Sequence, residues 1–359
     1  MSVLDTLDDL DRRIVVAMQN DGRASWRAIA EVVDSSTATV ARRGQHLISA
    51  GVIKVAVVPS LGATGDVSTF LIRITCQPGM QILVAAELVT HADVRFVTIV
   101  TGGYDIFAEL AVSGGATHYP QLVEELQSIT GIERWRSDLI MHIYKVSFDW
   151  GRQLFADTLR LPAVEHPADT RTAGTPGTPS TTDLQIVEPT PCSPTHFDSA
   201  DWKILDLLRD DGRVTFQAIA DSLGMNESSV RRRFERLKAA ECIDILTLVP
   251  APALGMGAET LMTVKVSPAR MDAVARELAQ HPAVRYLAAT LDENALFCEI
   301  IMPSTNDLYT FITSTLSQLD GVEGWTASME LLFLKRGFIE TPWWRGQVSY
   351  PELGAAASA

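Results

Sequence analysis

The chain has 359 residues, 47% of them hydrophobic and 21% charged, so it is longer than one ordinary domain of about 100 to 200 residues, and two to four globular domains are expected. Its formal net charge of −14 excludes a protein that coats nucleic acid without specificity, because such binding needs clustered Lys and Arg. The sequence shows neither a signal peptide nor a run of about 18 apolar residues, so we expect a cytoplasmic protein without membrane contact.

An internal repeat organises the chain. The tripeptide Asp-Gly-Arg occurs at 21–23 and again at 211–213, an offset of 190 positions, and at the same offset Trp135 matches Trp325. A stretch rich in Pro, Thr, Gly and Ser separates the two copies and predicts a flexible linker. Two tandem copies of one unit are therefore expected.

The first part of each copy predicts three short helices. In the first copy, apolar residues recur at helical spacing in three stretches, 10–18, 26–33 and 40–48. The second copy repeats the pattern over 204–237. Ser36 and Asn226 stand where an N-cap side chain would accept from the first-turn N–H groups. Short helices joined by a tight turn predict a helix-turn-helix.

The second part of each copy alternates strands and helices. In the first copy, strands are expected at 68–75, 95–100, 106–112 and 135–146, and helices at 80–91 and 118–129. The second copy repeats this order between 261 and 337. The order βαββαβ is typical of a ferredoxin-like sandwich.

The predicted fold class is therefore α+β, with two tandem units, each a winged or three-helix helix-turn-helix followed by a ferredoxin-like βαββαβ effector domain. The predicted segments are helix-turn-helix domains at 1–56 and 197–246, effector domains at 57–152 and 247–345, a linker at 153–196 and a tail at 346–359. The four cysteines stand far apart without a CxxC pair, which predicts reduced thiols and neither a zinc site nor a disulfide framework.

Basic residues gather on the third helix of the second copy. Against the acidic Glu235, five residues leave a local excess of +4 there: Arg231, Arg232, Arg233, Arg236 and Lys238. A basic stripe in an acidic chain predicts contact with the phosphates of double-stranded DNA. The alternative is a solvated helix face with intrahelical ion pairs.

These residues resemble the leucine-responsive regulatory protein / asparagine regulator (Lrp/AsnC) family of prokaryotic transcription factors. The similar motifs are Leu7-Asp8 with Asp11 and Ile14, Asp21-Gly22-Arg23, Val-x-x-Arg at 40–43 and 230–233, Ala50-Gly51-Val52-Ile53, and Gly102-x-Tyr104-Asp105. The resemblance implies a DNA-binding regulator that responds to a small effector, an amino acid or related metabolite, and forms homo-oligomers. The tandem fusion is similar to the double-unit regulators of actinobacteria.

Candidate DNA contacts follow from the third helix of each copy. In the second copy Asn226, Ser228, Ser229 and Arg232 are expected near base edges, and Arg231, Arg233 and Arg236 in phosphate and packing roles. The candidates in the first copy are Thr37, Thr39, Arg42 and Arg43.

The copies differ in their third helices. The first copy has Gly44 and His46 where the second has Phe234 and Arg236. A glycine inside a helix costs about 1 kcal/mol relative to alanine, and an apolar contact is lost as well, so the first reading helix is predicted to be the weaker one.

In the effector domains the asymmetry reverses. The first copy has Thr101, Gly102, Gly103, Tyr104 and Asp105, where the family resemblance implies an effector site at an interface between subunits. Its glycine-rich turn can offer N–H groups to a carboxylate, and Asp105 can accept from an ammonium group. An ordinary tight hairpin turn is the alternative. The equivalent positions of the second copy include Asp292, Asn294 and Ala295, so we expect the first copy to sense and the second to read DNA.

Two rival functions remain open. Siroheme decarboxylases are similar to this family and also occur as paired units, but neither 101–107 nor 290–297 has their His-Asn-Tyr type stretch. No metal-ligand spacing, nucleophile motif or phosphate loop is present, so neither catalysis, metal nor cofactor is predicted. The second rival is an effector sensor that no longer binds DNA. We further expect the two effector domains to pack face to face as a pseudo-dimer, either within one chain or by exchange between chains. Such pseudo-dimers are expected to associate into homo-oligomers.

Overall fold

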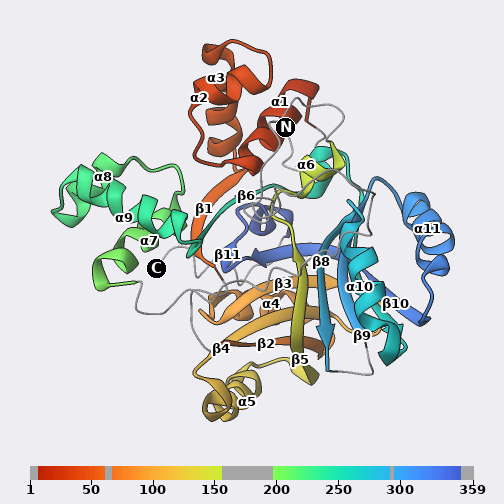
Figure 1. Cartoon of the computed structure of the whole chain (residues 1–359). Coiled ribbons are helices and arrows are strands. Elements are labelled where there is room, and N and C mark those ends of the chain that lie inside the picture. The colour runs from red at the N-terminus through yellow and green to blue at the C-terminus, as the bar shows by residue number, and fades with distance from the viewer. Residues whose placement is uncertain (1–6, 61–66, 156–196, 292–294, 349–359) are drawn as a thin grey trace, which may run out of the picture.

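A computed structural model describes residues 7–60, 67–155, 197–291 and 295–348 (Figure 1). Most of the predicted linker and tail lie outside these ranges, as do Asp292 and Asn294. None of the helices in the described ranges is long and apolar enough to cross a membrane. Two helical modules project from a single β-rich body, and we call them the first and second heads.

Each head contains the three predicted helices. The first head consists of α1 (Asp9–Asn20), α2 (Trp26–Val32) and α3 (Thr37–Ser49), and the second of α7 (Ser199–Asp210), α8 (Phe216–Leu223) and α9 (Glu227–Ala239). Their starts follow from capping residues. Asp8 accepts from the N–H of Asp11, and Asp198 forms a capping box with Asp201. Ser36 caps α3 as predicted, whereas Asn226 stands at the N-cap of α9 without a capping bond from its side chain, so that expectation was wrong.

The βαββαβ order is confirmed in both effector domains. In the first, the elements are β2 (Val67–Cys76), α4 (Gln81–Thr90), β3 (Val94–Val100), β4 (Ile106–Ser113), α5 (Tyr119–Ser128) and β5 (Ile132–Val146). In the second they are β7 (Ala258–Val266), α10 (Met271–Gln280), β8 (Val284–Thr290), β9 (Ala295–Met302), α11 (Thr305–Ser314) and β10 (Val322–Arg336). The predicted α+β fold class is therefore correct.

The two long strands β5 and β10 join the domains into one sheet. The first half of β5 pairs with β2 of its own domain, and its second half pairs with β8 of the other. In the same way β10 pairs first with β7 and then with β3, and β11 (Ile339–Glu340) adds to its edge. Because β10 contacts both β7 and β3, the sheet closes on itself.

The inner faces of the two domains pack together as predicted. Their shared core contains Leu71 and Phe107 from the first domain with Leu261 and Phe297 from the second. The rings of Phe107 and Phe297 stack with centroids 5.9 Å apart. The pseudo-dimer therefore forms within one chain, which confirms that prediction.

The heads are attached to the body through a two-stranded ribbon. It consists of β1 (Lys54–Pro59) and β6 (Ile243–Leu248), which pair antiparallel and each follow the third helix of a head. The first head also packs on the body, through Trp150 of α6 (Trp150–Leu154) and Leu254. One sequence expectation fails nearby, because Cys242 is disulfide-bonded, whereas Cys76 and Cys298 are free and buried.

Candidate nucleic-acid interface and ligand site

The third helix of each head is the candidate reading helix. α3 and α9 each have 13 residues and bury one face in their own head. The predicted contact residues run from the N-caps and first turns of these helices to Arg43 in α3 and Arg236 in α9. Thr37, Arg42, Asn226, Ser228, Arg231, Arg232 and Arg236 are exposed, and Thr39, Arg43, Ser229 and Arg233 are partly buried. The structure thus presents a polar edge on both helices.

Two predicted arginines are used inside the heads. Arg43 forms ion pairs with Asp8 and Asp11 at the start of α1. Arg233, at the equivalent position of α9, contacts Asp198 and the fully buried Asp201 at 2.7 and 2.9 Å. The hydrogen bond from Arg233 lowers the pKa of Asp198 to about 2. We assign both arginines to fixing the reading helix against the first helix of its head.

Other basic residues of α9 also have acidic partners. Arg231 pairs with Glu227, Arg236 with Asp201 at 2.6 Å, and Lys238 with Asp21 at 3.9 Å. The excess of positive charge read from the sequence is therefore partly balanced within the fold. Arg42 and Arg232 differ, because they form no ion pair or hydrogen bond within the described ranges. They occupy equivalent positions, 190 apart.

The predicted defect at Gly44 is absent. α3 runs through Gly44 without interruption, and the glycine is buried. A Cβ there would lie 2.6 Å from Cη2 of Trp26, so the indole fills the space that a side chain at this position would need. In the second head Phe216 and Phe234 pack together, with ring centroids 5.2 Å apart. The missing apolar contact is thus supplied from α2, so the expected loss of packing at Gly44 was wrong. The smaller contribution of this helix to DNA binding stays a prediction.

The repeated Asp-Gly-Arg motif holds the two heads together. Arg23 donates to the carbonyls of Gly212 and Val214, and Arg213 donates to those of Gly22 and Ala24. Each guanidinium also lies over a ring of the other head, Arg213 at 4.1 Å from the Trp26 centroid and Arg23 at 4.6 Å from that of Phe216.

The glycines of this motif are needed for close approach. A Cβ on Gly212 would lie 2.8 Å from the backbone nitrogen of Ala56, and one on Gly22 would lie 2.7 Å from Oγ1 of Thr247. In the sequence this motif marks the repeat but not the contact that it makes. The motif recurs unchanged in both copies, and this recurrence could have indicated that the two copies contact each other through it.

The predicted effector loop lies between the two domains. It joins β3 to β4, and its Thr101 exchanges two hydrogen bonds of 2.9 Å with the backbone of Met329 on β10. Gly102 has φ +103° and faces Ser328 of the same strand. In the part of the chain that the structure describes, the N–H groups of Gly102 and Gly103 form no hydrogen bond, so they are open to an acceptor.

Tyr104 and Asp105 are turned toward their own domain. Tyr104 meets the ring of Phe107 edge to face at 6.1 Å. Asp105 accepts at 2.8 Å from the N–H of Cys76, and the Gln81 amide lies 3.4 Å from its other oxygen. This carboxylate anchors the loop to β2 and α4, so much of its accepting capacity is already used.

The inside of the closed sheet carries charged residues that sequence reasoning missed. Arg95 pairs with Glu109, and at the equivalent positions Arg285 pairs with Glu299, both pairs being buried. The first pair lies on β3 and β4, and the second lies on β8 and β9. The apolar residues of these strands predicted a hydrophobic core and no buried ion pair. The 190-residue offset between the two pairs was the only sequence signal.

Comparisons with known proteins agree with this arrangement. Residues 7–48 and 197–238 match the family model of the AsnC-type helix-turn-helix domain, and 259–337 match that of the Lrp/AsnC ligand binding domain. The transcriptional regulator LrpA of Pyrococcus abyssi is 31% identical over 126 residues, which are 35% of this chain and 89% of that protein. The regulator FL11 of Pyrococcus furiosus is 28% identical over 147 residues, 41% of this chain and 96% of that protein.

One solved structure resembles the whole chain. The siroheme decarboxylase NirDL superposes with a TM-score of 0.55 at 13% identity, and the match covers 98% of this chain and 100% of that one. At this identity the likeness concerns the fold. Two heads and two effector domains in one closed body are therefore an architecture with a known precedent.

Proposed function

Because the chain belongs to the Lrp/AsnC family of transcriptional regulators, we propose that it binds double-stranded DNA sequence-specifically and responds to a small effector. The observation that carries this proposal is the reciprocal bonding of Arg23 and Arg213. It fixes two reading heads as a pseudo-symmetric pair, which is what a DNA site with two half-sites requires. Such a protein acts in the cytoplasm.

The proposed base contacts come from the polar edges of α3 and α9. Arg42 and Arg232 are the first candidates, because both are exposed and have no partner within the described ranges. Asn226, Ser228, Ser229, Thr37 and Thr39 stand around the same helix starts. Arg231 and Arg236 are assigned to phosphates, where an acidic neighbour in the free protein can be exchanged for a phosphate oxygen.

DNA binding can be tested by fluorescence anisotropy with fragments of the promoter region of the protein's own gene. We expect the double variant Arg42→Ala/Arg232→Ala to lose specific binding, whereas Arg276→Ala on α10 keeps it. Affinity should fall steeply with salt, since phosphate contacts release counterions. A protein that binds its effector but no promoter fragment would instead be a sensor that has lost DNA binding.

The effector is proposed to be an amino acid or related metabolite at the 101–105 loop. Its carboxylate would accept from the open N–H groups of Gly102 and Gly103, while Asp105 holds the loop in place. A thermal-shift screen of amino acids tests this. We expect at least one amino acid to raise the melting temperature of the wild type. Gly103→Pro should abolish this shift, because proline removes an N–H. The exposed control variant Glu323→Gln should retain it.

We also propose that the chains form homo-oligomers. Two large apolar side chains, Met141 on β5 and Leu331 on β10, occupy equivalent positions and are 51% and 61% exposed. Exposed apolar residues repeated by pseudo-symmetry suit an interface between copies. Light scattering at micromolar concentration should give a dimer or a larger species, and a monomer would contradict this part of the proposal.

The enzyme alternative rests on the whole-chain likeness to the siroheme decarboxylase NirDL. We propose that this chain is not an enzyme, because the loops of its effector domains lack the His-Asn-Tyr type stretch. Anaerobic incubation with siroheme, followed by mass spectrometry, should leave the substrate unchanged. Loss of carbon dioxide from siroheme would establish the alternative.

A further inference from the structure

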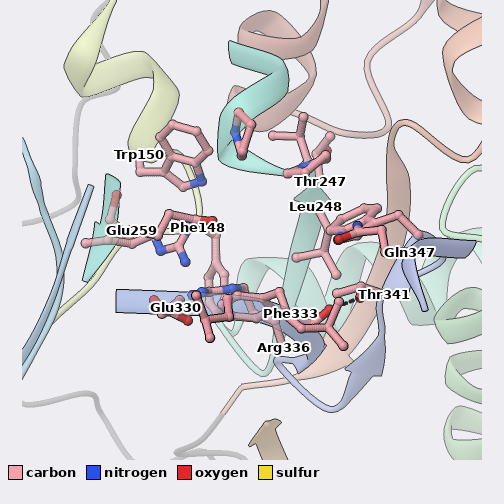
Figure 2. A pocket seen from close by; sticks show the side chains of 18 residues that line it. Phe148, Trp150, Thr247, Leu248, Glu259, Glu330, Phe333, Arg336, Thr341 and Gln347 are labelled. Atoms are coloured by element: carbon pink, nitrogen blue, oxygen red, sulfur yellow. Dashed lines mark hydrogen bonds and ion pairs between the residues drawn. The ribbon is translucent and has the colours of Figure 1, made fainter. Parts of the chain in front are cut away.

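A cavity of about 110 Å³ lies where the closed sheet meets the segments that lead to the heads (Figure 2). Its apolar walls include Phe148, Trp150, Leu248 and Phe333, and its charged side chains come from β7, β8 and β10. None of the residues of the 101–105 loop lines it. It is therefore a different site from the proposed effector loop.

The charges around this cavity do not balance. Glu299, just behind its wall, accepts from Arg285 at 2.9 Å and from Arg336 at 2.8 Å, so both cations are engaged by one carboxylate. Glu259 has only a longer contact of 3.6 Å with Arg285. With Glu330, three carboxylates thus share the guanidinium groups of Arg285 and Arg336.

Glu330 is the group left over. Both its carboxylate oxygens are buried and form no hydrogen bond, and the residue lines the cavity together with Glu259 (Figure 2). Its neighbours are the carboxylates of Glu299 and Glu259 and the already engaged Arg285, and a buried carboxylate in such a setting is costly. Its position beside the cavity suggests that a ligand supplies the positive charge that the protein does not.

The two acids belong to one half of the pseudo-dimer only. The strand registers place Glu259 opposite Ile301 and Thr69 opposite Ala111, at equivalent positions. In the same register Glu330 corresponds to Ile140 of the first half. The first half is therefore neutral where the second has two acids, although the fold is the same. Folding alone does not require carboxylates at these positions.

We propose that this cavity binds a small organic cation, an ammonium group on a short apolar chain, with Glu330 and Glu259 balancing its charge. The apolar chain lies against Trp150 and Phe333. A cavity of about 150 Å³ is known to hold benzene, so the ligand is smaller than or comparable to benzene. The site goes beyond the proposed DNA-binding function, and its test requires no DNA.

The electrostatics of the cavity fit this ligand. Burial and the neighbouring carboxylates raise the pKa of Glu330 well above its usual value and that of Glu259 to about 7. In the free protein these two acids therefore hold a proton near neutral pH. A bound cation replaces that proton, so binding releases protons to the buffer.

The cavity is also connected to a head. Thr247 lines it and donates at 2.7 Å to the carbonyl of Met18 at the end of α1, and Gly151, next to Trp150, donates to Gln19 at 3.1 Å. A ligand that shifts these walls can bias the position of the first head.

Isothermal titration calorimetry with n-butylammonium chloride tests the site on the full chain. We expect saturable binding at pH about 7, with a heat that depends on the ionisation enthalpy of the buffer because protons are released. The isosteres n-butanol and n-butyrate should bind at least about tenfold more weakly, since neither offers a positive charge. Equal binding of butanol, or no binding of butylammonium, would overturn the proposal.

Variants separate the site from general effects. Glu330→Gln and Glu259→Thr, the second copying the first half, should each weaken butylammonium binding by about tenfold or more. Glu330→Gln should also remove most of the proton release. The exposed Glu323→Gln on the same strand is the matched control and should bind normally. Unchanged affinity in a folded Glu330→Gln protein, checked by circular dichroism, would refute the assignment.

Discussion

The two heads have the same three helices but are held differently. The core of the first head continues into the body, where Trp150, Ala251 and Leu254 are buried against α1. The core of the second head consists of its own helices and residues from the ribbon, such as Val57 and Ile243. One head is docked, and the other is carried on the ribbon and on the exchange of Arg23 and Arg213 (Figure 1).

The difference teaches that a tandem fusion frees each copy to specialise. In a homodimer every change appears twice, on both sides of the two-fold axis. Here a tryptophan stands at 150 where the second copy has Glu340, and acids stand at 259 and 330 where the first copy has Thr69 and Ile140. Only a fused pair can dock one head on the body while the other is attached through the ribbon. Likewise, only a fused pair can place acidic residues in one effector domain and neutral ones in the other.

The largest effect is expected from Trp150→Ala. This side chain is 4% exposed and belongs to the core of the first head, so its loss should cost about 4 kcal/mol of unfolding free energy. Hydrogen exchange should accelerate in α1–α3 and stay unchanged in α7–α9. The control is Trp202→Ala, because Trp202 lies on the second head and is 42% exposed. If Trp150→Ala accelerated hydrogen exchange equally in both heads, the first head would not be docked through Trp150.

A pH dependence should distinguish the two effector halves. The pKa of Glu259 is raised from 4.5 to about 7 by burial, with Glu299 adding to the rise and Arg285 opposing it. The folded state therefore holds a proton that the unfolded chain releases above about 4.5. Stability is greatest below that pH and is lost as the pH rises toward about 7, by on the order of 3 kcal/mol.

Urea denaturation between pH about 5 and 8 measures this loss. Glu330 faces the same cluster, so the slope is shared by the two acids. Glu259→Thr, which gives the second half the residue of the first, should flatten the dependence. Glu323→Gln should leave it as in the wild type. A slope as steep in Glu259→Thr as in the wild type would assign the titration elsewhere.

The reading helices should differ in their contribution to DNA affinity. α9 carries Arg231, Arg236 and Lys238 beside Arg232, whereas α3 has only Arg43 and His46 near Arg42. A head held by more phosphate contacts keeps its base contact in better register. We expect Arg232→Ala to weaken specific binding by about 2 kcal/mol and Arg42→Ala by less than half of that. Equal losses in anisotropy titrations would mean that both heads read alike.

The elements and the repeat could be predicted from the sequence because both are local signals. Apolar spacing predicted the helices over 26–33 and 40–48, and alternation predicted the strand over 68–75. Turn and cap residues such as Ser36 marked the helix starts. The pseudo-dimer followed from placing two such sheets in one chain.

The partners of individual side chains could not be predicted, because they lie far away in sequence. Nothing near Gly44 shows that Trp26 fills its space, and nothing near Arg233 shows that Asp198 and Asp201 neutralise it. The exchange of β5 and β10 between domains is likewise a long-range pairing. Charge read along one helix therefore overestimated the surface charge of α9.

The smallest effect, about 1 kcal/mol, is expected at Gly44 and has an informative sign. Helix propensity alone predicts that Gly44→Ala stabilises α3 by about 1 kcal/mol. The structure predicts the opposite, because the new Cβ would lie 2.6 Å from Cη2 of Trp26, and crowding a packed site costs about 1 to 3 kcal/mol. Chemical denaturation should therefore show a net loss for Gly44→Ala. In the background of Trp26→Ala the same substitution should become stabilising, since the ring is gone. A stabilising Gly44→Ala in the wild-type chain would show that the indole does not occupy this space, and the first reading helix would then be as weak as its sequence suggests.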